Sequence, residues 1–120
     1  MHLAGMKTTL ALAVLLCTFT VFADEVTLTG EIVDVHCYTS RGARGEEHAG
    51  CSNACISRDV PAALLTDDGT LYLLVNEKPV SVKEKIAGMA GKKVTAKGKV
   101  VERSGMKALQ LASVEVMPAP

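Results

Sequence analysis

The segment HxxCxxxC places His48, Cys51 and Cys55 at positions i, i+3 and i+7 of the chain. In a helix of 3.6 residues per turn, side chains with this spacing lie within an arc of about 60°. Thiolates and imidazoles are preferred ligands of Cu(I) and Zn(II), whereas calcium requires several oxygen ligands. The segment therefore predicts three ligands for a soft or borderline metal ion on one face of a helix.

Cys37 is the fourth candidate ligand, because it ends a strand-like run over residues 26–37 that precedes the segment. Three cysteines and one histidine form a tetrahedral ligand set that suits zinc or copper. The predicted ligands are thus Cys37, His48, Cys51 and Cys55. On the strand, Asp34 is a candidate for the carboxylate that orients a ligand histidine, and His36 is a candidate alternative ligand.

Two other interpretations of the cysteines remain open. A disulfide from Cys37 to Cys51 or Cys55 would tie the strand to the helix and stabilise a small domain by about 3 kcal/mol. Thiols near the start of a helix are also typical of redox-active proteins. A c-type haem attachment sequence and a thioredoxin-type pair both have two residues between their cysteines, whereas Cys51 and Cys55 have three between them. The spacing therefore excludes those two motifs.

The chain begins with the features of a secretory signal peptide. Lys7 precedes an apolar run over residues 8–22, and the small residue Ala23 stands before Asp24. The run is too short to span a bilayer comfortably. We therefore expect residues 1–23 to be removed on export, leaving one domain over residues 24–120 in the periplasm or secreted.

The charge and the aromatic content disfavour two classes of partner. Basic and acidic side chains are equal in number, 13 of each, and loss of Lys7 leaves a domain with about one net negative charge. Such a domain does not attract nucleic acid or an anionic membrane surface. The domain has only Tyr38 and Tyr72 on which bases could stack. We expect neither nucleic acid nor, after cleavage, a membrane as a partner.

The pattern of apolar residues predicts a mainly β fold. The predicted strands are residues 26–37 with a bend at Gly30, then 62–65, 71–75, 93–103 and 106–117. The segment 38–45 reads as an exposed loop and 46–57 as a short helix, and Val82, Ile86 and Met89 indicate a second short helix within residues 78–91. Five strands in this order suit a small Greek-key barrel of the OB type.

The chain also resembles small exported bacterial proteins that combine an OB-like barrel with a Cys…HxxCxxxC signature. The resemblance rests on Gly30, Glu31, Ile32, Val33, Asp34, Cys37, His48, Cys51, Cys55, Pro61, Leu64, Leu65, Asp68, Gly69, Leu71, Tyr72, Ala90, Gly91, Lys92 and Val94. It spans nearly all of residues 24–120 and implies the fold and the position of the site. It implies no catalytic residues.

The sequence is therefore interpreted as that of a metal-binding protein rather than an enzyme, with zinc or copper as the cofactor. The expected partners are the metal ion and a periplasmic protein. The alternative is a disulfide-stabilised module that binds a protein, peptide or sugar, or a thiol redox protein. The metal-binding and disulfide interpretations differ in whether Cys37 is bonded to a metal ion or to another cysteine.

Overall fold

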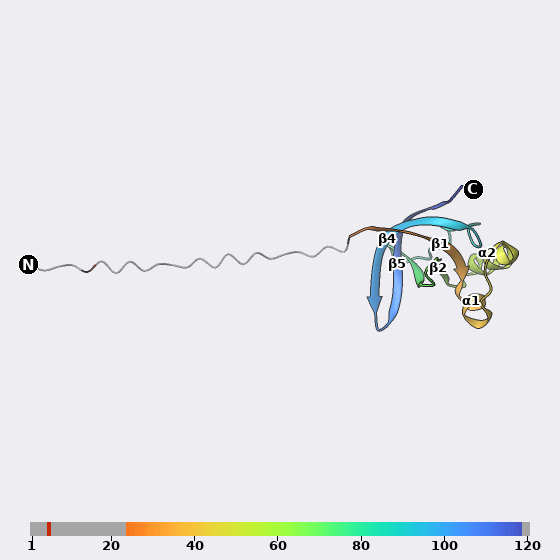
Figure 1. The fold of residues 1–120 in the computed structure, drawn as a ribbon, viewed down its shortest axis with the longest axis horizontal. Coiled ribbons are helices and arrows are strands. Elements are labelled where there is room, and N and C mark those ends of the chain that lie inside the picture. Colours follow the sequence, from red (N-terminus) through yellow and green to blue (C-terminus); the bar gives the residue numbers. More distant parts are fainter. Residues whose placement is uncertain (1–4, 6–23, 119–120) are drawn as a thin grey trace, which may run out of the picture.

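The computed structural model describes Gly5 and residues 24–118, so the predicted signal peptide at 1–23 falls almost wholly outside the described residues. Five strands close into a barrel in the order β1-β2-β3-β5-β4 (Figure 1). The strands are β1 (Val26–Asp34), β2 (Ala62–Thr66), β3 (Leu71–Asn76), β4 (Lys93–Arg103) and β5 (Met106–Val116). Neighbouring strands are antiparallel except β3 and β5, which are parallel. This confirms the predicted mainly β, OB-like barrel.

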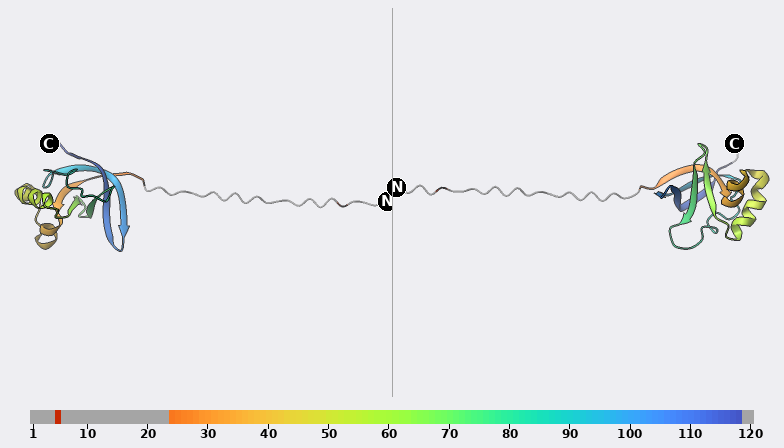
Figure 2. Two further views of the ribbon diagram at one scale, coloured as in Figure 1. Left: turned by 180° about the vertical axis from the view of Figure 1, so that it is seen from behind. Right: turned by 90° about the horizontal axis from the view of Figure 1, so that it is seen from below.

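Two short helices lie in the connection between β1 and β2. They are α1 (Val35–Arg41) and α2 (Ala49–Ser57), and a 3-10 turn, η1 (Glu46–His48), leads directly into α2. Figures 1 and 2 show both helices together at the side of the barrel away from the tip of the β4–β5 hairpin. The predicted helix over 46–57 is thereby confirmed as η1 and α2. Among the described residues, neither helix has the length and apolarity needed to cross a bilayer.

The other helix is not where the sequence analysis placed it. β1 ends at Asp34 and α1 begins at the next residue. The helix therefore includes residues 35–37, which were predicted as the end of the strand, and residues 38–41, which were predicted as loop. The reason is a pair of local helix signals: Asp34 caps the first turn, and Gly42 ends the helix in the left-handed conformation with φ 68°. Cys37 is therefore a helix residue, not a strand residue.

The predicted helix within residues 78–91 is wrong, because this segment consists of bends and turns. Its amides bond three residues back, from Lys85 to Val82 and from Met89 to Ile86, and Gly88 has φ 74°. The apolar pattern was nevertheless informative about burial. Val82 and Ile86 are buried in the main core, and Met89 packs against it.

The barrel interior holds an almost purely aliphatic core. Its largest fully buried side chains include Ile32, Leu64, Leu109 and Leu111. A smaller cluster of Val33, Ala63 and Leu65 forms on the other face of β1 and β2, because these residues alternate with those of the interior core. Val35, Tyr38 and Leu71 pack against it. This second cluster anchors α1 to the outside of the barrel, because Val35 and Tyr38 are α1 residues.

A reciprocal contact between Asn53 and Ala90 helps to hold α2 against the barrel. The Asn53 side chain accepts a hydrogen bond from the Ala90 amide at 3.0 Å and donates one to the Ala90 carbonyl at 3.5 Å. The next residue, Gly91, approaches so closely that a Cβ there would lie 2.7 Å from the Cβ of Ala49. The position of α2, and of the residues just before it, is therefore set by the segment that precedes β4.

Gly98 allows β4 to bend, and its replacement tests the closure of the barrel. The pairing of β4 with β5 shifts register between Lys97 and Gly98, and a Cβ on Gly98 would overlap the carbonyl of Gln110. We expect Gly98→Ala to lower the free energy of unfolding by about 2 kcal/mol, because backbone must move to accommodate the methyl group. Urea denaturation measures the loss. Lys99→Ala, at an exposed position of the same strand, is the control and should change stability by less than about 0.5 kcal/mol.

Candidate metal centre

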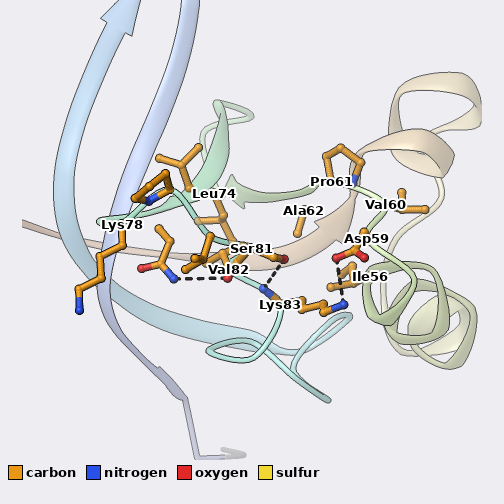
Figure 3. A pocket seen from close by; sticks show the side chains of 14 residues that line it. Ile56, Asp59, Val60, Pro61, Ala62, Leu74, Lys78, Ser81, Val82 and Lys83 are labelled. Carbon is orange, nitrogen blue, oxygen red and sulfur yellow. Dashed lines mark hydrogen bonds and ion pairs between the residues drawn. The ribbon is translucent and has the colours of Figure 1, made fainter.

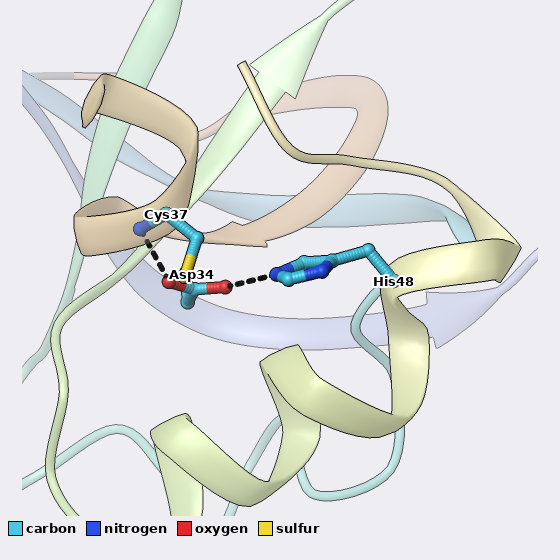
Figure 4. A group of neighbouring side chains, drawn as sticks. All are labelled: Asp34, Cys37 and His48. Carbon is cyan, nitrogen blue, oxygen red and sulfur yellow. Dashed lines mark hydrogen bonds and ion pairs between the residues drawn. The ribbon is translucent and has the colours of Figure 1, made fainter. Parts of the chain in front are cut away.

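Asp34, Cys37 and His48 bring three potential ligand atoms within 4.8 Å of one another. Figure 4 shows the carboxylate between the thiol and the imidazole, with the three side chains pointing toward a common centre. They come from the end of β1, the first turn of α1 and the end of η1. A carboxylate, a thiol and an imidazole in this arrangement are a typical donor set for a borderline metal ion.

Asp34 positions Cys37 through the cap of α1. The Cys37 amide donates a hydrogen bond of 2.7 Å to Oδ1 of Asp34. Because the amide is held in this way, the first turn of α1 starts directly at the barrel and carries the Cys37 thiol inward. Both side chains are buried, Asp34 completely.

His48 is positioned from the other side by the loop after α1. The amide of Gly45 donates to Oε2 of Glu31 at 2.7 Å, and the His48 amide donates to the Gly45 carbonyl at 3.1 Å. Glu31 lies on β1, as Asp34 does. β1 therefore positions Cys37 through Asp34 and His48 through Glu31. The His48 side chain is only 15% exposed.

Ser52 is a member of the site that the sequence analysis did not single out. Its hydroxyl donates a hydrogen bond of 2.7 Å to Oδ2 of Asp34, and its side chain is buried. It lies four residues after His48, on the part of α2 that faces the barrel. The spacing of Ser52 and Ile56 on a short helix was the available signal, since residues four apart share a face.

The imidazole of His48 holds a buried nitrogen without a hydrogen-bond partner. Nε2 lies 3.3 Å from Oδ2 of Asp34, close enough for an ion pair but without the alignment of a hydrogen bond. Two ligand atoms on one tetrahedral zinc ion, each 2.0–2.2 Å from the metal, are roughly 3.3 to 3.6 Å apart. The separation of Nε2 and Oδ2 therefore matches that of two ligands sharing an ion.

The charges of the group favour a cation between the three side chains. Burial raises the pKa of the Cys37 thiol, and the neighbouring Asp34 carboxylate raises it further, while Arg41 partly offsets both effects. Burial alone would raise the pKa of Asp34, but hydrogen bonds, first that from the Cys37 amide and then that from Ser52, outweigh it and leave this pKa lowered. Asp34 is thus ionised beside a protonated thiol. A metal ion here would displace the thiol proton and would then stabilise the thiolate and the carboxylate together.

The remaining predicted residues lie around this group rather than within it. His36 is exposed on α1. Cys51 is exposed and Cys55 half-buried on α2, and a charge on Cys51 is close enough to raise the pKa of Cys37. Within residues 24–118, Cys37, Cys51 and Cys55 are all free thiols. Participation of Cys51 and Cys55 in the same metal site stays a prediction.

A cavity of about 390 Å³ opens elsewhere on the surface, between the C-terminal end of α2, the start of β2 and residues 78–83 (Figure 3). An ion pair of 3.0 Å between Lys83 and Asp59 crosses it. Its lining includes Ile56 and Leu74 but none of the residues of the Asp34 group. The cavity is therefore separate from the candidate metal centre.

Comparison with known proteins adds no family to this description. No family model matches the chain, and no curated protein matches it. The function is therefore inferred from the geometry of the site itself.

Proposed function

We propose that the protein binds one zinc or copper ion through the thiolate of Cys37 and the imidazole of His48, with the Asp34 carboxylate as the third ligand. The observation that carries this proposal is the unpartnered, buried Nε2 of His48 at 3.3 Å from Oδ2 of Asp34. The Asp34 carboxylate satisfies this nitrogen only in part, because the contact lacks the alignment of a hydrogen bond, and a metal ion would supply a full bond. In this proposal the protein acts after export, once residues 1–23 have been removed.

The donor set determines which ions fit. One sulfur, one nitrogen and one oxygen ligand suit Zn(II) and copper better than calcium or magnesium, which prefer oxygen ligands alone. Three protein ligands leave the fourth position of a tetrahedral ion open. Water or a ligand of a partner protein would take that position, and such a replaceable fourth ligand would allow exchange of the ion.

Replacement of Cys37 by serine tests the proposal spectroscopically. The purified, reduced protein is titrated with Co(II), which takes zinc sites and reports sulfur ligation by an intense near-ultraviolet charge-transfer band. We expect one ion per chain with such a band, and loss of the band in Cys37→Ser, because serine cannot supply the thiolate.

Cys55→Ser is the matched control, since it removes a thiol that lies outside the group of three. It should retain the stoichiometry and the band of the unaltered protein. A Cys37→Ser variant that folds and keeps the band would refute the site, as would an unaltered protein that takes up no metal ion.

A further inference from the structure

α2 carries two thiols, Cys51 and Cys55, four residues apart. The residues of α2 that are buried against the barrel are Ser52 and Ile56, whereas Cys51 is exposed and Cys55 half-buried. Side chains at i and i+4 of a helix are neighbours, with their Cβ atoms about 5 to 6 Å apart. The two thiols therefore form an accessible pair held at a fixed spacing by the helix.

This spacing opposes a disulfide between the two thiols. A disulfide requires Cβ atoms about 3.8 Å apart, so it would force the middle of α2 out of helical geometry. A metal ion between two thiolates has no such requirement. With metal–sulfur bonds no longer than the about 2.3 Å of zinc thiolates, a linear two-coordinate ion separates the sulfur atoms by up to roughly 4.6 Å. Rotation of the two side chains about χ1 accommodates this span on an intact helix.

The charge around the pair favours a monovalent ion. The guanidinium of Arg58 donates a hydrogen bond of 3.7 Å to the Cys55 sulfur, which places one positive charge beside the pair. Two thiolates with one Cu(I) carry a single net negative charge, which Arg58 balances. Zn(II) needs four ligands, of which this surface supplies two, whereas Cu(I) is satisfied by two thiolates.

We propose that Cys51 and Cys55 form a second metal site, distinct from the Asp34 group, which binds one monovalent thiophilic ion such as Cu(I) between two thiolates. Both thiols release their protons on binding, and no electron transfer is involved. This site goes beyond the proposed function, because neither sulfur belongs to the three ligand atoms gathered at Asp34. The spacing in the sequence instead predicted both cysteines as ligands of one ion shared with Cys37 and His48.

The test isolates the pair from the buried group. The full chain carrying Cys37→Ser and His48→Ala is kept reduced and anaerobic and is titrated with Cu(I) against a chromophoric Cu(I) chelator. We expect one Cu(I) per chain. The comparison variant adds Cys51→Ser and Ser57→Cys, which leaves the number of thiols on α2 unchanged but places them at i and i+2, positions that do not face each other. Its affinity for Cu(I) should be at least about 100-fold lower, because the chelating arrangement is lost.

A measurement on the otherwise unaltered protein keeps the proposal testable if the double substitution impairs folding. One equivalent of phenylarsine oxide, which bridges two neighbouring thiols, should protect Cys51 and Cys55 from alkylation, as located by peptide mass. Equal Cu(I) affinity in the rearranged variant, or absence of this protection, would overturn the second site. So would complete loss of Cu(I) from a folded Cys37→Ser/His48→Ala protein, because that result means one shared ion. Zinc binding by the same double variant tests the buried site separately. If the Cys37→Ser/His48→Ala protein bound zinc as well as the unaltered protein, the site at Asp34 would be refuted and the second site would not.

Discussion

The His48→Ala protein will bind zinc more than about 100-fold more weakly than the unaltered protein. Even removal of a group that only orients a ligand costs roughly 10- to 100-fold in metal affinity, and His48 is proposed as a ligand itself. Its Nε2 is the buried nitrogen without a hydrogen-bond partner, so its loss removes one of three ligands and leaves no other imidazole in the group. Competition with a chromophoric zinc chelator measures the change.

His36→Ala is the matched control for this experiment. It removes a second imidazole from the same connection between β1 and β2, but His36 is exposed on α1. Its zinc affinity should stay within about threefold of the unaltered value, because surface substitutions rarely perturb a buried site. A His48→Ala protein that folds and binds zinc normally contradicts the proposed site. Equal losses in both variants would indicate instead that the helices as a whole, not His48, determine binding.

The barrel was predictable from the sequence because its signals are local and repeated. Alternation of apolar residues and the turns at 66–69 and 104–105 determine strands whose order leaves few ways to close a small barrel. The segment around Val82 and Ile86 was predicted less well for a physical reason. Its apolar spacing records burial against the barrel, but Gly88 and the three-residue hydrogen bonds produce turns rather than a helix.

The candidate site was predicted in part. Cys37 and His48 were both expected to be ligands, and the structure brings them together. Their third companion, Asp34, was predicted to orient a ligand histidine and was not among the four main ligands. Its role as the cap of α1 was not predicted, because the run through Cys37 was interpreted as a strand. Asp34 followed by Gly42 is the spacing of an N-cap and a C-terminal glycine, and this signal would have indicated α1.

The contact of Ser52 with Asp34 could not be predicted in the same way. It joins α2 to the end of β1 across 18 positions of the chain. Such a contact depends on how α2 is seated against Ala90 and Gly91, which are far from both partners in sequence. The spacing of the residues in α2 shows which of them share a face of the helix. It does not show which face packs against the barrel and which is exposed to solvent. The exposure of Cys51 is a consequence of the same seating.

Asp34 should contribute more to the stability of the metal-free protein than any other polar side chain of the site. Its carboxylate is completely buried and accepts hydrogen bonds from the Cys37 amide and the Ser52 hydroxyl, each at 2.7 Å. Asp34→Ala leaves these two buried donors without an acceptor, at about 1 to 3 kcal/mol each, and removes the cap of α1. We expect the free energy of unfolding, measured with chelator present, to fall by about 3 kcal/mol or more.

The pH dependence separates the charge of Asp34 from its size. Because hydrogen bonds outweigh burial and hold the pKa of Asp34 below its ordinary value of 3.8, folding favours the ionised carboxylate. This stabilisation is fully present above the ordinary value and is lost as the pH falls through 3.8 toward the lowered pKa of the folded state. The stability difference between the unaltered protein and Asp34→Asn should therefore narrow on acidification. Asp67→Asn is the control, because Asp67 forms an exposed ion pair with Lys93. It should lower the free energy of unfolding by less than about 1 kcal/mol at any pH. If Asp34→Asn left the acid sensitivity of the protein unchanged, a different carboxylate would have to cause that sensitivity. The ionised Asp34 on which the proposed metal site depends would then lose its support.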